Sequence, residues 1–202
     1  MGTVDIVTKE YMRENAIFAD AFNYLIYGGK KVIDPAGLTE IDTATSAVGK
    51  KDALQKYRDV LKAAVIKQDE KMSYVLLGVE NQTDVHYAMP VRNAIYALQY
   101  GKQVSDIAAG HRRSQKDYSG KTGGEYLSGF LKEDHIKPVI TLVIHFGAEE
   151  WDGPLSLHEM MPIRDMEILS YVENYRIHLI DPAKLTEEEL NKFSTSMREV
   201  MG

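Results

Sequence analysis

The chain has 202 residues, of which 44% are apolar and 27% are charged, so it has the length and composition of one globular domain with a sizeable core. It contains no cysteine, which excludes disulfides, thiolate metal sites and a cysteine nucleophile. Because the sequence shows no secretory leader and no apolar run long enough for a bilayer, we expect a cytoplasmic protein without a membrane partner.

The net charge of −6 is distributed unevenly. Residues 133–202 contain 14 acidic and 6 basic residues, whereas residues 1–132 contain 16 acidic and 18 basic residues. The bases of the first part are concentrated in residues 50–67 and 102–121. The chain therefore lacks the overall basic charge of many nucleic-acid-binding proteins, although either basic stretch permits contact with a polyanion. The simpler interpretation of both stretches is a solvated surface.

The N-terminal part of the sequence predicts a helix and three strands. Residues 10–27 carry a broad apolar stripe at helical spacing and precede two glycines, a common helix end. Residues 38–43 alternate between apolar and polar and predict a first strand, and residues 44–53 are small and polar and predict a loop. Residues 54–66 predict a second strand. Residues 72–79 are almost all apolar, which is typical of a strand buried on both faces.

The C-terminal part predicts a helix, a buried strand and an acidic extension. The predicted elements are a helix over 88–104 with proline in its first turn, a polar loop over 110–125, a buried strand over 137–146, a short helix over 155–161, an edge strand over 175–180 and a final helix opened by the capping box at 186–189. Two buried strands joined by a helix imply a parallel crossover. We therefore expect an α/β core over residues 1–150, with residues 151–202 packed on or near it.

A candidate metal site lies at the end of the buried run 72–79. Glu80 and Gln82 are two residues apart on a strand, so their side chains share one face. If the preceding strand pairs beside this one, Asp59 brings a second carboxylate within metal-bridging range. Mg²⁺ or Mn²⁺ would bind these oxygens together with water and phosphate. The alternative is that Glu80 begins a loop and Asp59 pairs with a nearby lysine, and spacing alone favours that alternative.

A polar stripe on the helix predicted over 88–104 offers a second set of candidates. Arg92, Tyr96 and Gln99 recur at helical spacing and share one face. Directed at the end of the sheet, this face would bind phosphate or orient the carboxylates, and arginine is suited to bidentate phosphate contact. The alternative is a solvent-exposed polar face, with the apolar side chains packed inward at Ala88, Val91, Ile95 and Leu98.

Taken together, these residues resemble those of the Rpn family of recombination-promoting nucleases, also described as transposases. That family belongs to the PD-(D/E)XK nuclease superfamily. The matching segments occur in the family's order and cover roughly residues 10–160. They are residues 18–23, 57–61, 78–83, 89–96 and 138–147. The combination is far more specific than any single motif, and it favours a nuclease over the alternatives above.

The resemblance implies a restriction-endonuclease-like core of helix, three strands, helix and strand, and Mg²⁺-dependent cleavage of DNA. It implies that Asp59 and Glu80 bind the metal and that Gln82 stands where the superfamily has lysine. A glutamine orients water by hydrogen bonds but supplies no charge, and losing such a preorganised group costs about 10²–10³-fold in rate. We therefore expect a slow enzyme, or one in which Lys62 substitutes for the missing charge.

Further positions carry over from the same resemblance. Arg92 and Tyr96 match polar helix positions that face the site, and we expect them, with Lys62, to contact phosphate or DNA. Glu14 and Asp20 both compete for the position of an acid that the family places on the first helix.

Three functions follow as hypotheses. The first is a metal-dependent DNA endonuclease acting in recombination or on mobile elements. The second is a DNA-binding module that keeps the nuclease fold with weak or no activity, which Gln82 and the acidic surface favour modestly. The third is a structural or oligomerisation partner, with a homodimer as one form, that uses Trp151 and the acidic C-terminal segment.

Overall fold

The computed structural model of the protein describes residues 3–41, 59–68, 71–114 and 120–202. Its elements, in chain order, are α1 (Thr3–Arg13), α2 (Asn15–Tyr27), η1 (Pro35–Gly37), β1 (Leu38–Glu40), β2 (Val60–Gln68), β3 (Lys71–Gln82), α3 (Met89–Tyr96), α4 (Leu98–Arg113), α5 (Gly123–Ser128), β4 (Val139–His145), η3 (His158–Met160), α6 (Met166–Leu169), β5 (His178–Ile180), η4 (Pro182–Lys184), α7 (Glu187–Leu190) and α8 (Met197–Met201). The predicted loop 44–53 and parts of the first two predicted strands lie outside the described residues.

A five-stranded mixed sheet forms the centre of the molecule, in the order β1-β2-β3-β4-β5. Strand β2 is antiparallel to both β1 and β3, whereas β4 runs parallel to both β3 and β5. Helices α3 and α4 connect β3 to β4, so the predicted parallel crossover and the α/β class are confirmed. The edge strand β5 belongs to the segment that the sequence predicted as an extension, so residues 151–202 contribute directly to the sheet.

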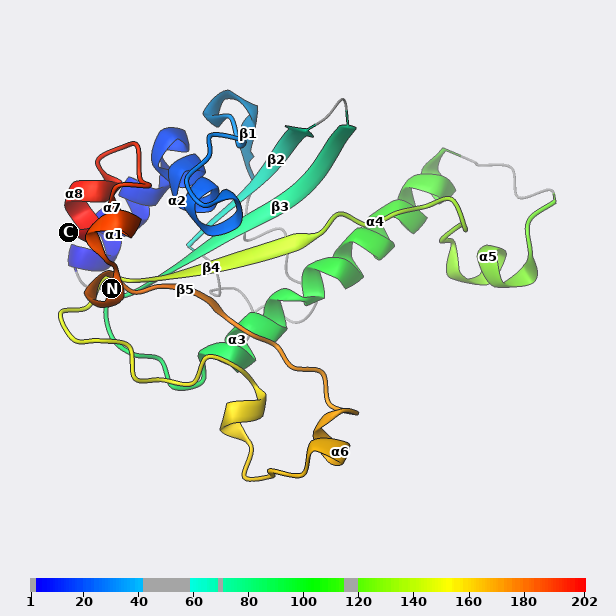
Figure 1. The fold of residues 1–202 in the computed structure, drawn as a ribbon. Helices are drawn as coiled ribbons and strands as arrows, with labels where there is room; N and C mark the ends of the chain where they lie inside the picture. The colour runs from blue at the N-terminus through cyan, green and yellow to red at the C-terminus, as the bar shows by residue number, and fades with distance from the viewer. Residues whose placement is uncertain (1–2, 42–58, 69–70, 115–119) are drawn as a thin grey trace.

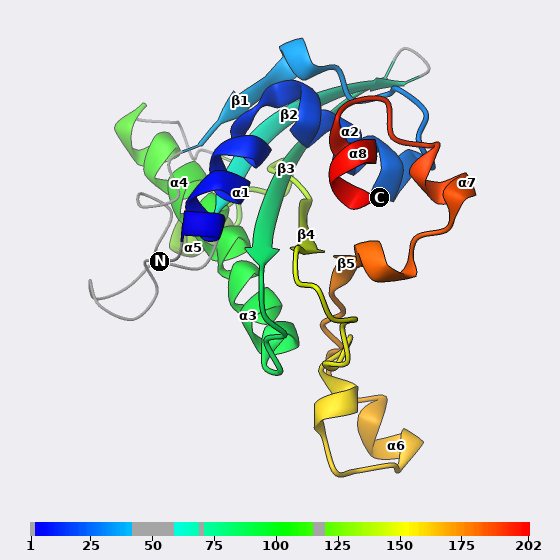
Figure 2. The same cartoon turned by 90° about the vertical axis from the view of Figure 1, so that its left-hand side faces the viewer.

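One face of the sheet is covered by α1, α2 and α8, as Figures 1 and 2 show from two directions. Apolar side chains that alternate along β2, β3 and β4 join Phe18 and Phe22 of α2 in the main core. The sequence predicted a single helix over 10–27, but the chain breaks at Glu14, whose ψ of 122° is extended. This break frees the carbonyl of Arg13, which accepts a hydrogen bond from the ammonium group of Lys62.

The other face of the sheet is crossed by α3 and α4 (Figure 1). A smaller apolar cluster lies between them and the sheet, made of Met89, Tyr96, Val143, Trp151 and Ile177. The predicted helix 88–104 is two helices that meet at Ala97 and continue to residue 113, so the predicted polar loop begins later than residue 110. Its predicted first-turn proline is confirmed, because a proline lies at the start of α3.

The C-terminal residues return to the first face of the sheet, beside α2 (Figure 2). Phe193, Met197 and Met201 are buried in the main core. The capping box at Thr186 is confirmed, but it opens only the short α7, and a separate α8 follows. In the described part of the chain, no helix has the length and apolar character that crossing a membrane requires.

Candidate functional site

Glu80 is a buried carboxylate near the end of β3, with only 3% of its surface exposed. It shares its face of the sheet with Gly78 and Gln82 on the same strand, because side chains alternate between faces. The neighbouring positions on β4 are Thr141, Val143 and His145. This is the face crossed by α3 and α4. A buried carboxylate is costly unless charge and hydrogen bonds compensate it, so its partners define the site.

Side chains from β3 and α3 hold the Glu80 carboxylate. The guanidinium of Arg92 forms an ion pair with Oε1 through Nη2. The hydroxyl of Tyr96 donates to Oε2 at 2.6 Å, and Nε2 of Gln82 donates to Oε1 at 3.1 Å. The polar stripe of α3 thus faces the sheet, while Val91 of the same helix is 40% exposed. The alternative of a solvated polar face with Val91 packed inward is wrong.

Asp59 lies beside Glu80, immediately before β2. Its backbone N–H donates to the carbonyl of Val79 at 3.2 Å, and its Oδ2 accepts from the backbone N–H of Asn81 at 2.9 Å. Asp59 therefore contacts the residue on each side of Glu80. The pairing of β2 with β3 produces this proximity, since Val60 stands opposite Val79 in the register.

A lysine that no sequence pattern indicated, Lys9 of α1, has its Nζ 3.9 Å from Oδ1 of Asp59. About a quarter of each side chain is exposed, so the ion pair is accessible to water. Lys9 is fifty residues away from Asp59 in the sequence, and no local pattern links the two. The site thus has a lysine near its carboxylates, although it comes from a helix and not from the strand.

Lys62 does not lie with Glu80, and its predicted role in DNA contact or in place of the missing lysine is wrong. It is three residues beyond Asp59, so strand alternation turns its side chain to the opposite face. There it is 1% exposed and its Nζ bonds the carbonyl of Arg13 and, at 2.6 Å, Oδ1 of Asn15. Burial lowers the pKa of Lys62, the effect expected for a desolvated ammonium.

Neither acid proposed for the first helix joins the pair. Asp20 is buried on the other face, where its carboxylate accepts hydrogen bonds from the N–H groups and hydroxyls of Ser194 and Thr195. Glu14 is exposed at the break between α1 and α2. Within the described ranges, no group of three or more histidine, aspartate or glutamate side chains is arranged to hold a metal ion.

The electrostatics around Arg92 also affect His86, which precedes α3. Burial, followed by the charge of Arg92, lowers the pKa of the His86 imidazole. The neutral ring suits its contact, since Nδ1 accepts a hydrogen bond from the backbone N–H of Ala88 at 3.2 Å. His86 therefore adds no positive charge at neutral pH, whereas Arg92 and Lys9 each place a cation beside one of the two carboxylates.

The two carboxylates suit a divalent cation in their chemistry. Mg²⁺ is commonly bound by one or two carboxylates, with water and substrate phosphate completing its ligands. Asp59 and Glu80 are hard oxygen donors at one end of neighbouring strands, and each already has a protein cation beside it. This pairing indicates that both positions favour positive charge. A metal ion there would compete with Arg92 for Glu80, which would release the guanidinium towards a phosphate.

Comparisons of the chain with protein-family models, with curated proteins and with solved structures found no match. The functional interpretation therefore rests on the residues of the site and on their geometry.

Proposed function

We propose that the protein is a metal-dependent DNA endonuclease with a restriction-endonuclease-like core. The observation that carries the proposal is the convergence of Asp59, Glu80, Gln82, Arg92 and Tyr96 from two strands and a crossover helix. Local spacing accounts for the pairs Glu80–Gln82 on the strand and Arg92–Tyr96 on the helix, but the meeting of the two pairs, and of Asp59 with them, depends on the tertiary fold. The family resemblance would place the reaction in recombination or on mobile elements.

Each residue has a role in the proposed hydrolysis of a phosphodiester. Asp59 and Glu80 would hold Mg²⁺, which supplies a polarised phosphate and a more acidic attacking water. Tyr96 orients the Glu80 carboxylate through its hydroxyl. Arg92 has the fork geometry for a phosphate once it leaves Glu80. The hydrogen bonds of Gln82 engage its Nε2, so its amide oxygen can accept a hydrogen bond from the attacking water and orient it.

A second candidate function is a DNA-binding module with little activity. It is favoured by the position of Lys62, because the strand lysine expected to compensate for Gln82 is buried on the wrong face. In this case DNA would bind with a strong salt dependence, as phosphate contacts require, but would not be cut. A contribution of Lys9 to the rate of DNA cleavage would favour the endonuclease over the binding module.

Cleavage of plasmid DNA tests the proposal. We expect wild-type protein to nick plasmid in Mg²⁺ and not in EDTA, and we expect Asp59→Asn and Glu80→Gln to lose at least about 10²-fold in rate. Both substitutions keep side-chain size and remove charge. The matched control is Glu188→Gln, which removes an exposed carboxylate from α7 and should cleave at the wild-type rate.

Two results would argue against the endonuclease. Equal nicking by all the variants would mean that a contaminant cuts the DNA. If wild-type protein binds DNA but shows no Mg²⁺-dependent cleavage, the binding module is the correct function.

A further inference from the structure

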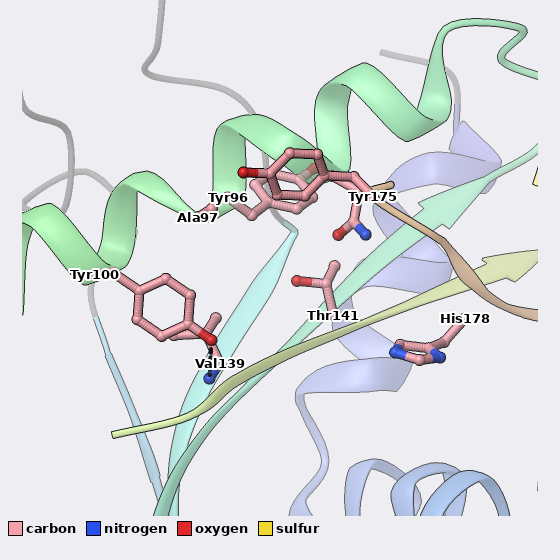
Figure 3. Close-up of a pocket in the computed structure, with 8 residues that line it drawn as sticks. Tyr96, Ala97, Tyr100, Val139, Thr141, Tyr175 and His178 are labelled. Atoms are coloured by element: carbon pink, nitrogen blue, oxygen red, sulfur yellow. Dashed lines mark hydrogen bonds between the residues drawn. The ribbon is translucent and has the colours of Figure 1, made fainter. Parts of the chain in front are cut away.

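A cavity of about 170 Å³ lies behind Glu80, between the α3–α4 junction and the sheet. Figure 3 shows side chains from the helices, from β4 and from the segment leading into β5 converging on it. Its lining residues are Asn93, Tyr96, Ala97, Tyr100, Val139, Thr141, Tyr175 and His178. Pockets for drug-sized ligands are larger, about 300–1,000 Å³, so this cavity admits one ring system and excludes an extended ligand.

The chemistry of the lining favours a flat, uncharged group. Three of the lining residues are tyrosines, and the described lining contains no carboxylate, ammonium or guanidinium group. A phosphate would find no cation here, and a metal ion would find no anionic ligand. Aromatic rings with a few amide, hydroxyl and imidazole groups are instead the surroundings in which proteins hold unpaired nucleobases.

Tyr96 connects the cavity to the candidate active site. Its side chain lines the cavity, while its hydroxyl donates to Oε2 of Glu80 at 2.6 Å. Two other hydrogen bonds hold the walls of the cavity in place. The hydroxyl of Tyr100 accepts from the backbone N–H of Val139 at 3.1 Å, and Nδ2 of Asn93 donates to the carbonyl of Arg176 at 2.6 Å. The cavity is therefore held at a fixed position relative to the carboxylates.

We propose that this cavity receives one unpaired base of the DNA strand whose phosphate lies at Glu80. This inference rests on the proposed function, from which it takes DNA as the ligand. It adds that the preferred DNA is single-stranded or locally unpaired. A base in a duplex would first have to leave its stack, which is least costly where pairing is already absent. Tyr175 is the side chain to test, because it lines the cavity but makes no contact with Glu80 in the described structure.

Affinities for DNA measured in EDTA distinguish contacts with a base from contacts with the sugar-phosphate backbone. The probes are a short oligothymidylate and an abasic oligomer of the same length and charge. We expect wild-type protein to bind the first about tenfold more tightly, the effect of one base contact with an aromatic ring. Tyr175→Ala should remove this preference, and Tyr175→Phe should keep it. Ala97→Leu, which fills the cavity without deleting a ring, should also remove the preference.

The matched control is Tyr171→Ala, which removes a tyrosine that is 92% exposed and outside the cavity, and which should bind like wild type. Equal affinity of wild-type protein for both probes, or an undiminished preference in both Tyr175→Ala and Ala97→Leu, would overturn the inference. Such a result together with Mg²⁺-dependent cleavage leaves the nuclease intact and rejects only the base pocket. A preserved base preference without any cleavage rejects the nuclease and supports the pocket.

Discussion

At the scale of single residues, the site depends on how charge is placed around two carboxylates. Gln82 donates one hydrogen bond to Glu80 but brings no charge, and Arg92 forms an ion pair with the same carboxylate. Lys9 is the described lysine within ion-pair distance of Asp59. An ammonium group near the metal ligands would stabilise an anionic nucleophile, which is the contribution that glutamine cannot make.

We therefore expect Lys9→Ala to lower the rate of Mg²⁺-dependent cleavage by about tenfold, less than for a fully buried donor because Lys9 is partly exposed. The loss should appear in kcat more than in KM, since the charge acts on the nucleophile. Lys9→Arg should recover most of the rate. Lys31→Ala is the control, because it removes the charge of an exposed lysine. If Lys9→Ala and Lys31→Ala cleave equally fast, Lys9 has no role in the reaction.

The residues of the site could be predicted where local rules decide their position. Alternation along β3 and helical spacing along α3 were sufficient to suggest that Glu80 and Arg92 meet. The same alternation places Lys62 on the face opposite to Asp59, so its misassignment came from proximity in sequence and could have been avoided. Lys9 could not have been predicted, because its approach to Asp59 depends on how α1 docks against the sheet.

At the scale of elements, the differences from prediction include a helix that a tertiary contact interrupts and a helix that begins inside a predicted loop. The apolar stripe over residues 10–27 gave no sign of the break at Glu14, because Lys62 stabilises it from a distant strand. The helix α5 was likewise hidden inside a segment rich in glycine and polar residues. Its capping box, in which Thr122 and Glu125 bond each other's backbone, starts the helix.

The capping box should make the stability of α5 depend on pH through the carboxylate of Glu125. Hydrogen bonds from the N–H groups of Thr122 and Lys132 and from the Thr122 hydroxyl lower the pKa of Glu125 to about 2 from an ordinary value of 4.5. Because the folded pKa is below the unfolded one, the ionised carboxylate stabilises α5 above pH 4.5, and this stability is lost as the pH falls towards 2.

Nuclear magnetic resonance should show the Glu125 carboxylate titrating near pH 2. The protection factors of the α5 amides against hydrogen exchange, relative to the unfolded chain, should fall over the same range. Glu125→Gln should lower the protection factors of the α5 amides and make them nearly independent of pH between 4.5 and 2. Glu173→Gln, which alters an exposed carboxylate elsewhere, serves as the control. Titration of Glu125 near pH 4.5 would mean that the capping box of Thr122 and Glu125 does not persist in solution.

At the scale of the whole molecule, the acidic C-terminal segment is part of the fold. It supplies β5 to the sheet and four buried apolar side chains to the main core, those of Ile180, Phe193, Met197 and Met201. The sequence suggested a core over residues 1–150 with an extension packed on or near it, and a strand of that extension joins the sheet. A buried carboxylate on α2, Asp20, joins the two ends of the chain through Ser194 and Thr195, across 174 residues of sequence.

Asp20→Ala should lower the free energy of unfolding by about 2–4 kcal/mol, because it leaves buried N–H and hydroxyl donors without their charged acceptor. Asp20→Asn keeps part of the acceptor capacity and should cost less. Urea unfolding measures both, with Asp106→Ala as the control, since its exposed ion pair with Lys102 is worth at most about 1 kcal/mol.

The Asp20→Ala variant also distinguishes a structural role of Asp20 from a catalytic one. Its carboxylate lies on the face of the sheet opposite to Glu80, so folded Asp20→Ala protein should keep Mg²⁺-dependent cleavage at the wild-type rate in the absence of urea. Loss of cleavage in a variant that remains folded would return Asp20 to the active site as the acid of the first helix. Loss of stability with cleavage retained would instead establish it as the link that closes the C-terminal segment onto the core.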